Sequence, residues 1–153
     1  MLLLLLMIMI MSRSVKTYFD QERLDVYQES IAFYGWVGVF LNEITAKAAA
    51  KDQIDRASTS LPLNIADGNS KLSTTDGARF LEIARGSALE CAACLDVLAA
   101  RKFVSPDRIT PAKEQLVRIV NRLTGMLKKF SSRAEFLRED EGPYAIEHEQ
   151  EHE

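Results

Sequence analysis

The chain of 153 residues is long enough for one domain, and its apolar content of 47% is sufficient for a hydrophobic core. Charged residues make up 27% of the chain and the net charge is −3, values that are ordinary for a soluble protein. Two cysteines and no secretory cleavage site exclude a disulfide-rich secreted domain and favour a reduced, cytoplasmic setting.

Residues 1–11 form an unbroken apolar run. A helix of that length would span about 16 Å, roughly half of the hydrocarbon thickness, so the run cannot cross a membrane alone. It also lacks the leading basic residue and the cleavage site of a secretory signal. Three interpretations stay open: an artefactual extension with translation starting at Met11, a disordered or self-associating arm, or a membrane anchor. We treat residues 1–19 as an extension and lead-in, and expect no membrane partner.

Residues 20–138 are predicted to be all-α, an antiparallel up-and-down bundle of four helices. Their apolar residues recur at spacings of three and four, and no sustained alternation with a period of two indicates a strand. The first helix is predicted over residues 20–50. Its inward seam comprises Val26, Phe33, Val37, Phe40 and Ile44.

A second apolar set lies beside this seam and widens the apolar surface of the first helix beyond one face. Gly35 and Gly38 each lower helix propensity by about 1 kcal/mol relative to alanine, so we expect the close approach of another helix to compensate. Such a helix needs two neighbours or a partner subunit. The expected oligomer interface comprises Tyr27, Ile31, Tyr34, Gly35, Gly38 and Leu41.

The pattern over residues 55–90 is typical of an antiparallel helical hairpin. Its first helix is predicted over residues 53–67, with a stop at Gly68 and a bend near Pro62. Ile54, Leu61 and Ile65 keep an inward stripe. We interpret Asn64, in the turn after the proline, as a buried structural amide that satisfies freed backbone groups or bonds to another helix.

The third helix is predicted over residues 75–102, opened by Ser73 and Asp76 at capping-box spacing. Its small flanking residues should make it the most tightly packed helix, and its inward side comprises Phe80, Ala84, Ser87, Cys91, Leu95 and Leu98. Cys91 and Cys94 have the C-x-x-C spacing of thiol oxidoreductases, but they lie in mid-helix. We therefore interpret them as buried small apolar residues.

The fourth helix is predicted from residue 107 or 110 to residue 137, with Pro106 or Pro111 in its first turn. Its apolar stripe comprises Leu116, Ile119, Val120, Leu123, Leu127 and Phe130. Beside it, within an arc of about 60°, lie Arg118, Arg122, Lys129 and Arg133, with Arg108 close by. Aligned cations match the regular spacing of phosphates. The simpler interpretation is that their stems cover apolar surface while their charges stay in water.

Residues 135–153 contain eight acidic residues and one basic residue, which leaves a net charge of +4 before them. We expect residues 139–153 to be a disordered acidic tail, which could also screen a basic surface. His148 and His152 match the H-E-x-x-H pattern of zinc proteases, but they lie at the end of the chain without a third ligand. We therefore expect no metal site.

The segments LPLNIADG at residues 61–68 and FLEIARGSALE at residues 80–90 resemble the four-helix-bundle proteins encoded in intervening sequences of 23S ribosomal RNA genes, also called S23 ribosomal proteins. The resemblance covers residues 24–133. Gly86, Ser87 and Glu90 match the family, whereas Asp67 replaces its usual glutamate and Lys71 stands where members commonly have arginine.

The resemblance implies a four-helix bundle assembled into a homo-oligomeric ring of five subunits, without enzyme activity. We expect no cofactor and no small-molecule substrate. Accessory variability determinant proteins of diversity-generating retroelements are similar bundles, and their basic surfaces bind nucleic acid and a reverse transcriptase.

Our leading hypothesis is therefore a non-enzymatic, cytoplasmic homo-oligomer that binds structured RNA or other nucleic acid. Its expected binding residues are Arg118, Arg122, Lys129, Arg133, Lys71 and Arg79. The alternative is a protein-interaction scaffold without nucleic acid, which the modest charge of the body favours. A third hypothesis, a metal-dependent hydrolase, would depend on His148 and His152, because the chain has no other histidine for a catalytic site.

Overall fold

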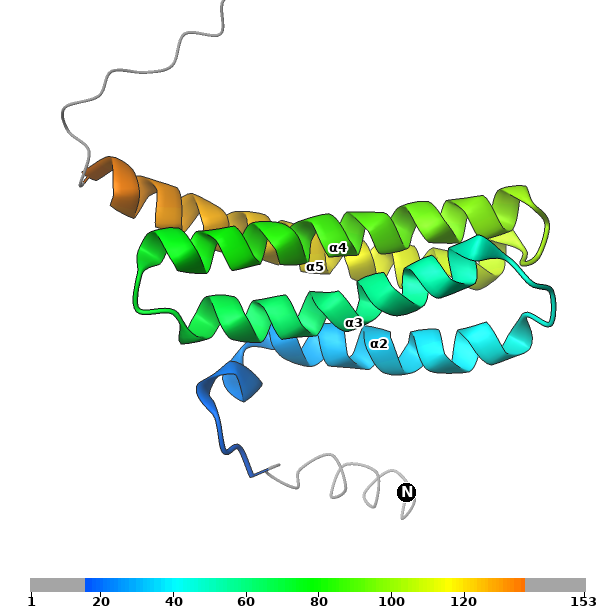
Figure 1. Cartoon of the computed structure of the whole chain (residues 1–153), viewed down its shortest axis with the longest axis horizontal. Helices are drawn as coiled ribbons and strands as arrows, with labels where there is room; N and C mark the ends of the chain where they lie inside the picture. Colours follow the sequence, from blue (N-terminus) through cyan, green and yellow to red (C-terminus); the bar gives the residue numbers. More distant parts are fainter. Residues whose placement is uncertain (1–15, 137–153) are drawn as a thin grey trace, which may run out of the picture.

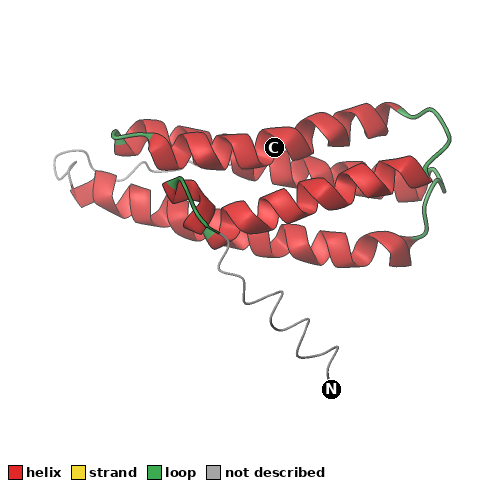
Figure 2. Cartoon of the chain, turned by 90° about the horizontal axis from the view of Figure 1, so that it is seen from below, coloured by secondary structure: helices red, strands yellow, loops and turns green. Residues whose placement is uncertain are grey.

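Four long helices lie side by side in this computed structural model, which describes residues 16–136 and the side chains of residues 16–131. The chain reverses direction at each connection between them (Figure 1). The elements are the short 3₁₀-helix η1 (Asp20–Arg23) and the helices α2 (Asp25–Glu43), α3 (Ala49–Ser70), α4 (Thr74–Ala100) and α5 (Pro106–Phe136). Within residues 16–136 there is no strand, which confirms the all-α prediction (Figure 2). Residues 1–15 of the predicted extension and the whole predicted tail of residues 139–153, with His148 and His152, lie outside the described residues.

The helices are arranged as a square in section. The pair α3 and α4 is the most extensive, α5 packs against α4 and α2, and α2 also packs against α3. The helices α2 and α4 lie diagonally across the bundle, so only their core side chains approach one another, and they are at the lower and upper edges of Figure 1. Among the helices of residues 16–136, none is both long and apolar enough to span a bilayer.

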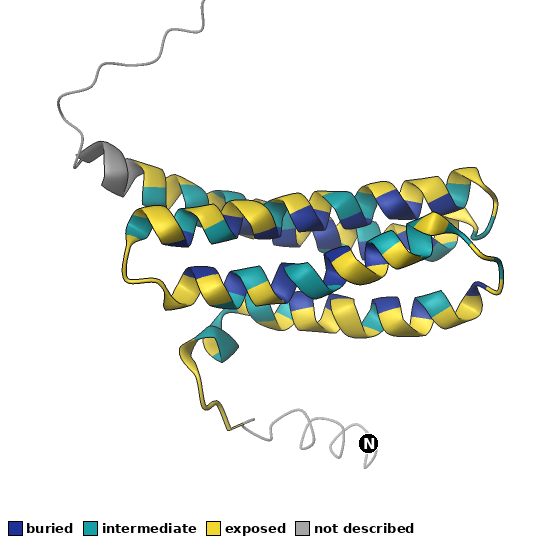
Figure 3. Cartoon of the chain, viewed as in Figure 1, coloured by how far each residue is buried: buried dark blue, intermediate teal, exposed yellow. Residues whose placement is uncertain are grey.

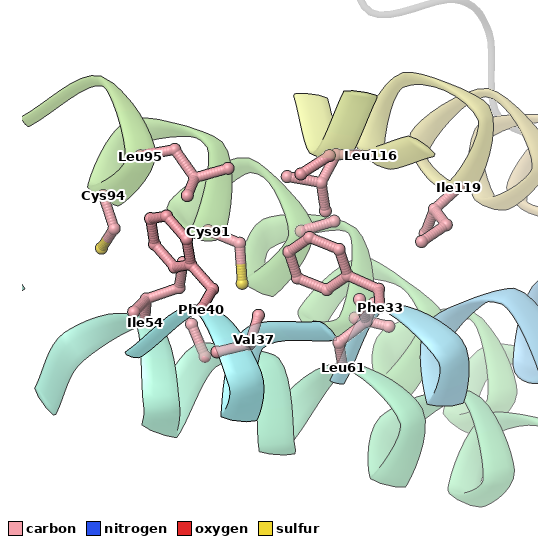
Figure 4. Close-up of a cluster of buried hydrophobic side chains, with 14 of the residues drawn as sticks. Phe33, Val37, Phe40, Ile54, Leu61, Cys91, Cys94, Leu95, Leu116 and Ile119 are labelled. Carbon is pink, nitrogen blue, oxygen red and sulfur yellow. The ribbon is translucent and has the colours of Figure 1, made fainter. Parts of the chain in front are cut away.

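The predicted seams supply most of the core, but Phe80 of α4 is only partly buried, and its neighbour Leu81 is the fully buried residue there. All five seam residues of the first predicted helix are at most 4% exposed, and Ile54, Leu61 and Ile65 of α3 are fully buried. In α4, Cys91 and Leu95 point into the same cluster, and Leu116 and Ile119 approach it from α5 (Figure 4). Buried residues alternate with exposed ones along each helix, as one apolar stripe per helix requires (Figure 3).

The first predicted helix, over residues 20–50, is wrong at both ends. Leu24 is extended between η1 and α2, and α2 ends at Glu43 because Ile44 is extended and buried. Ile44 and Thr45 are β-branched and have low helix propensity, so little stability is lost when the helix ends before them. Burial of the Ile44 side chain then favours the extended conformation. The side chain of Lys51 donates a hydrogen bond to the Ile44 carbonyl at 2.5 Å, and α3 has already begun at Ala49, before the predicted start.

The predicted stop at Gly68 is also wrong, because α3 continues to Ser70. Gly68 is buried, and no glycine of the described chain has a positive φ, so a left-handed turn is not its purpose. A Cβ atom there would lie 2.9 Å from the Leu81 side chain and 3.1 Å from the Gly77 carbonyl oxygen. Gly68 and Gly77 therefore allow α3 and α4 to approach closely.

The expected cap of α4 is present, since the Ser73 side chain accepts a hydrogen bond from the Asp76 backbone amide at 3.4 Å. Pro106 occupies the first residue of α5, and Pro111 lies further inside the helix.

Candidate nucleic-acid interface

The basic row of α5, defined here as Arg118, Arg122 and Lys129, runs along the side of the helix that faces α2. Spacings of four and seven residues place the three side chains on one face. Arg122 and Lys129 line a hollow of about 310 Å³ between the start of α2 and the end of α5, together with Asp25 and Gly125. No atom lies within 4 Å of where a Gly125 Cβ would be, so the surface between the two cations is open.

Glu29 of α2 binds two members of the basic row. One carboxylate oxygen accepts a hydrogen bond from Arg118 Nε at 2.8 Å, and the other accepts one from Arg122 Nη1 at 2.5 Å. Gln115 adds a side-chain hydrogen bond to the Glu29 backbone carbonyl at 3.2 Å. The Glu29 side chain is 14% exposed, whereas those of Arg118 and Arg122 are 56% and 45% exposed. The single negative charge of Glu29 is paired with the two positive charges of Arg118 and Arg122. The three side chains together therefore keep a net positive charge, and both arginines face solvent.

The other predicted cations lie elsewhere on the bundle. Lys71 follows α3 and places its ammonium 4.8 Å from the centroid of the Phe80 ring, while Arg79 is exposed on α4. A Cβ at Gly77 would lie 3.6 Å from the Phe130 ring, so the α3–α4 turn and the end of α5 occupy the same end of the bundle (Figure 1). Lys71 and Arg79 therefore share that end with Lys129 without joining the row. Arg133 lies within α5, but its side chain is outside the described side chains.

Arg108 does not extend the basic row. Its Nε and Nη2 atoms donate hydrogen bonds to the Glu43 carboxylate at 2.9 and 2.6 Å, and its guanidinium lies 5.3 Å from the Trp36 ring centroid. The hydrogen bond from Arg108 lowers the pKa of Glu43, and the same bond raises the pKa of Arg108. Arg108 thus clamps the start of α5 to the end of α2, at the end of the bundle away from Lys129.

The residues that carry the family resemblance meet in a polar ladder between α3 and α4. Asn64 donates hydrogen bonds to the backbone carbonyl and the hydroxyl of Ser60 at 2.8 and 2.9 Å, and Ser87 donates to the same hydroxyl at 2.9 Å. Further along, Gln53 donates to the Glu90 carboxylate and accepts from Arg56. Asn64 is thus a structural amide, as predicted, but it is only partly buried and bonds to Ser60 of its own helix, while Ser87 makes the connection to α4. The sequence did not lead us to expect Ser60 and Gln53 among these polar contacts, although they lie one and three helical turns before Asn64 on the same face.

The expected interface residues of α2 divide into two groups. Ile31 and Tyr34 are 44% and 43% exposed, whereas Tyr27 and Leu41 pack partly against the core of their own chain. No atom lies within 4 Å of a Cβ built at Gly35 or Gly38. The close helix approach expected there is therefore not made by any described part of this chain.

The described side chains do not assemble a metal-binding group, since no cluster of three or more histidine, cysteine, aspartate or glutamate residues occurs among them. Cys91 and Cys94 are free thiols in the interior of α4. Burial raises the pKa of Cys91 to about 12 and also raises that of Cys94, so neither is a reactive thiolate near neutral pH. This confirms the interpretation of both as core residues.

Comparison with known proteins shows the family of the chain and agrees with its fold. A family model described as 23S rRNA-intervening sequence protein matches residues 22–125, well over half of the chain. The crystal structure of a protein of unknown function from the S23 ribosomal protein family of Bacteroides thetaiotaomicron is similar in fold, with a TM-score of 0.64 and 21% sequence identity. The match covers 67% of this chain and 98% of that one. No curated protein matches the chain.

Proposed function

The chain belongs to the 23S rRNA-intervening sequence protein family, and on that premise we propose that it is a non-enzymatic, cytoplasmic homo-oligomer that binds structured RNA. The observation that carries this proposal is the basic row Arg118, Arg122 and Lys129 along one side of α5. Cations fixed on a rigid helix can contact successive phosphates of an RNA backbone without reading its bases. Lys71 and Arg79 add positive charge at the same end of the bundle.

The fixed positions and the solvent exposure of Arg118 and Arg122 support this function. Both are held in place by Glu29 and remain about half exposed. A phosphate that approaches the row meets guanidinium groups whose side-chain entropy has already been reduced, and each group can still donate from its remaining nitrogens. In a homo-oligomeric ring, which the family resemblance predicts with five subunits, the row would be repeated around the assembly and bind one RNA at several points.

The test is RNA binding by the full chain, measured by fluorescence anisotropy with a structured RNA hairpin at several salt concentrations. We expect Arg118→Gln combined with Lys129→Gln to weaken binding at least tenfold, and to reduce the slope of log affinity against log salt by about two. A matched control replaces Arg56 and Arg101 by Gln, the same loss of charge outside the basic row. RNA binding that does not depend on salt, or an equal loss of RNA affinity in both variants, would rule out the α5 interface.

A second candidate is a protein-interaction scaffold that binds no nucleic acid. It is favoured by the Glu29 carboxylate, which already neutralises part of the basic row, and by the exposed apolar residues Ile31 and Tyr34 on α2. Affinity purification with and without nuclease separates the two candidates. A protein partner that is retained after nuclease treatment, together with no RNA binding by the purified chain, would establish the scaffold function.

A further inference from the structure

The outward face of α2 carries no charged side chain. Between Asp25 and Glu43 the only charged residue is Glu29, and both glutamates are turned to arginines of α5. The exposed positions between Asp25 and Glu43 are Gln28, Ile31, Ala32, Tyr34, Gly35, Gly38, Val39 and Asn42. Val39 is 62% exposed, and the space above Gly35 and Gly38 is empty. A solvent-facing helix is normally charged on this side, so this composition indicates that the face is covered in the assembled protein.

A second uncharged face lies on the outward side of α4. Gly86, Leu89, Ala93 and Val97 follow one another at spacings of three and four, which keeps them on one side of the helix. Leu89 and Val97 are 49% and 51% exposed, and no atom lies within 4 Å of a Cβ built at Gly86. The neighbouring Asp96 is bonded to Lys113 of the same chain at 2.5 Å.

The two faces match in length and in shape. Residues 31–42 of α2 and residues 86–97 of α4 each span eleven residue steps, about 16 Å along a helix. When they are laid antiparallel, Gly35 lies opposite Ala93 at the centre, where small side chains permit a close crossing. Val39 and Leu89 meet on one side of this crossing, and Ile31 and Val97 meet on the other.

Opposite charges flank the two faces when they are laid antiparallel. Asp25, in the first turn of α2, then lies at the same end as Lys102, which is two residues past the end of α4. Lys47, four residues past the end of α2, lies at the same end as Glu82 of α4, so opposite charges flank the contact at both ends. All four of these residues are exposed.

We propose that the outward face of α2 packs antiparallel against the outward face of α4 from a second copy of this chain. The inference rests on the proposed homo-oligomer and specifies its contact. Because α2 and α4 occupy opposite corners of the bundle, one copy offers its two faces to two different neighbours (Figure 1). The contact is therefore heterologous, of the kind that generates closed rings or chains rather than symmetric dimers.

Cysteine cross-linking of the full chain tests the pairing. Gly35→Cys and Ala93→Cys place thiols at the proposed crossing, and wild-type protein with buried Cys91 and Cys94 is the background control. We expect a rapid disulfide-linked dimer when the two single variants are mixed, little product from either variant alone, and a ladder of higher species from the double variant. Gly35→Cys mixed with Leu63→Cys, an exposed position on α3, should give no such product.

The outcomes separate this inference from the proposed function. If light scattering shows that the wild-type chain is monomeric, the homo-oligomer and the pairing fail together. If the chain assembles but Gly35→Cys cross-links with itself, α2 packs against α2 and the heterologous pairing is overturned while the oligomer stands. The pairing is likewise overturned if the chain assembles and the mixed variants give no more product than the Leu63→Cys control.

Discussion

Arg118 and Glu29 are joined by a hydrogen bond of 2.8 Å between Nε and a carboxylate oxygen, across 89 positions of the sequence. The pair connects the middle of α5 to the first half of α2. Its carboxylate is mostly covered and its guanidinium is mostly exposed, at 14% and 56%. The glutamate thus holds the arginine in position on the protein side, and it also competes with any phosphate that approaches from solvent.

Replacement of Glu29 by glutamine should strengthen RNA binding. The change removes one negative charge next to Arg118 and Arg122 and preserves the shape of the side chain, so we expect affinity to rise about threefold to tenfold at low salt. Anisotropy titrations with the RNA hairpin measure the effect. Glu114→Gln, on the exposed side of α5, is the control with the same change of net charge. Equal gains in both variants would show that only net charge matters.

Gly68→Ala should destabilise the bundle. The new methyl group would lie 3.1 Å from the Gly77 carbonyl oxygen and 2.9 Å from the Leu81 side chain, so α3 and α4 must separate. We expect a loss of about 1–3 kcal/mol in the free energy of unfolding, as for other overpacked cores. Gly125→Ala is the control, because its methyl group meets nothing and helix propensity should give a gain of up to about 1 kcal/mol. The measurement is urea denaturation followed by circular dichroism. A gain of stability in both variants would contradict the close approach of α3 and α4 at Gly68.

The Arg108 and Glu43 clamp should make stability depend on pH. Its hydrogen bond lowers the pKa of Glu43 from the usual 4.5, so the folded state binds the proton less readily than the unfolded state. The stabilisation is therefore complete above about pH 5 and is lost as pH falls through the lowered pKa. Wild type should be more stable than Glu43→Gln at pH 7, and this difference should shrink at pH 3. A difference that is unchanged between the two pH values would show that the charge on Glu43 is unimportant.

Local periodicity predicted the helices and their cores, because each buried seam repeats once per helical turn. Val26, Phe33 and Val37 are buried as expected from spacing alone. The errors at Ile44 and Gly68 have a common cause, since both depend on contacts between helices. Ile44 leaves the helix and is buried in the core, and Gly68 is small because Leu81 and Gly77 of the next helix approach it.

The candidate site was predicted only in part, for the same reason. The helical angle places Arg118, Arg122 and Lys129 together without knowledge of the tertiary structure. Their partner Glu29 is on another helix, and no local pattern connects the two segments. Arg108 was grouped with the row by its angle on the helix, but the length of α5 carries it to the opposite end, where Glu43 binds it.

The thiols of the native chain should resist modification. Burial raises the pKa of Cys91 to about 12, so its thiol is almost entirely protonated at pH 8, and burial raises the pKa of Cys94 as well. We expect Ellman's reagent to modify neither thiol of the folded chain within minutes, and both at once in 6 M guanidinium chloride. Gly125→Cys, an exposed thiol on α5, gives the rate for an accessible group. Native thiols that react as fast as this control, or a disulfide between Cys91 and Cys94 under mild oxidation, would contradict their assignment to the core and reopen the C-x-x-C interpretation.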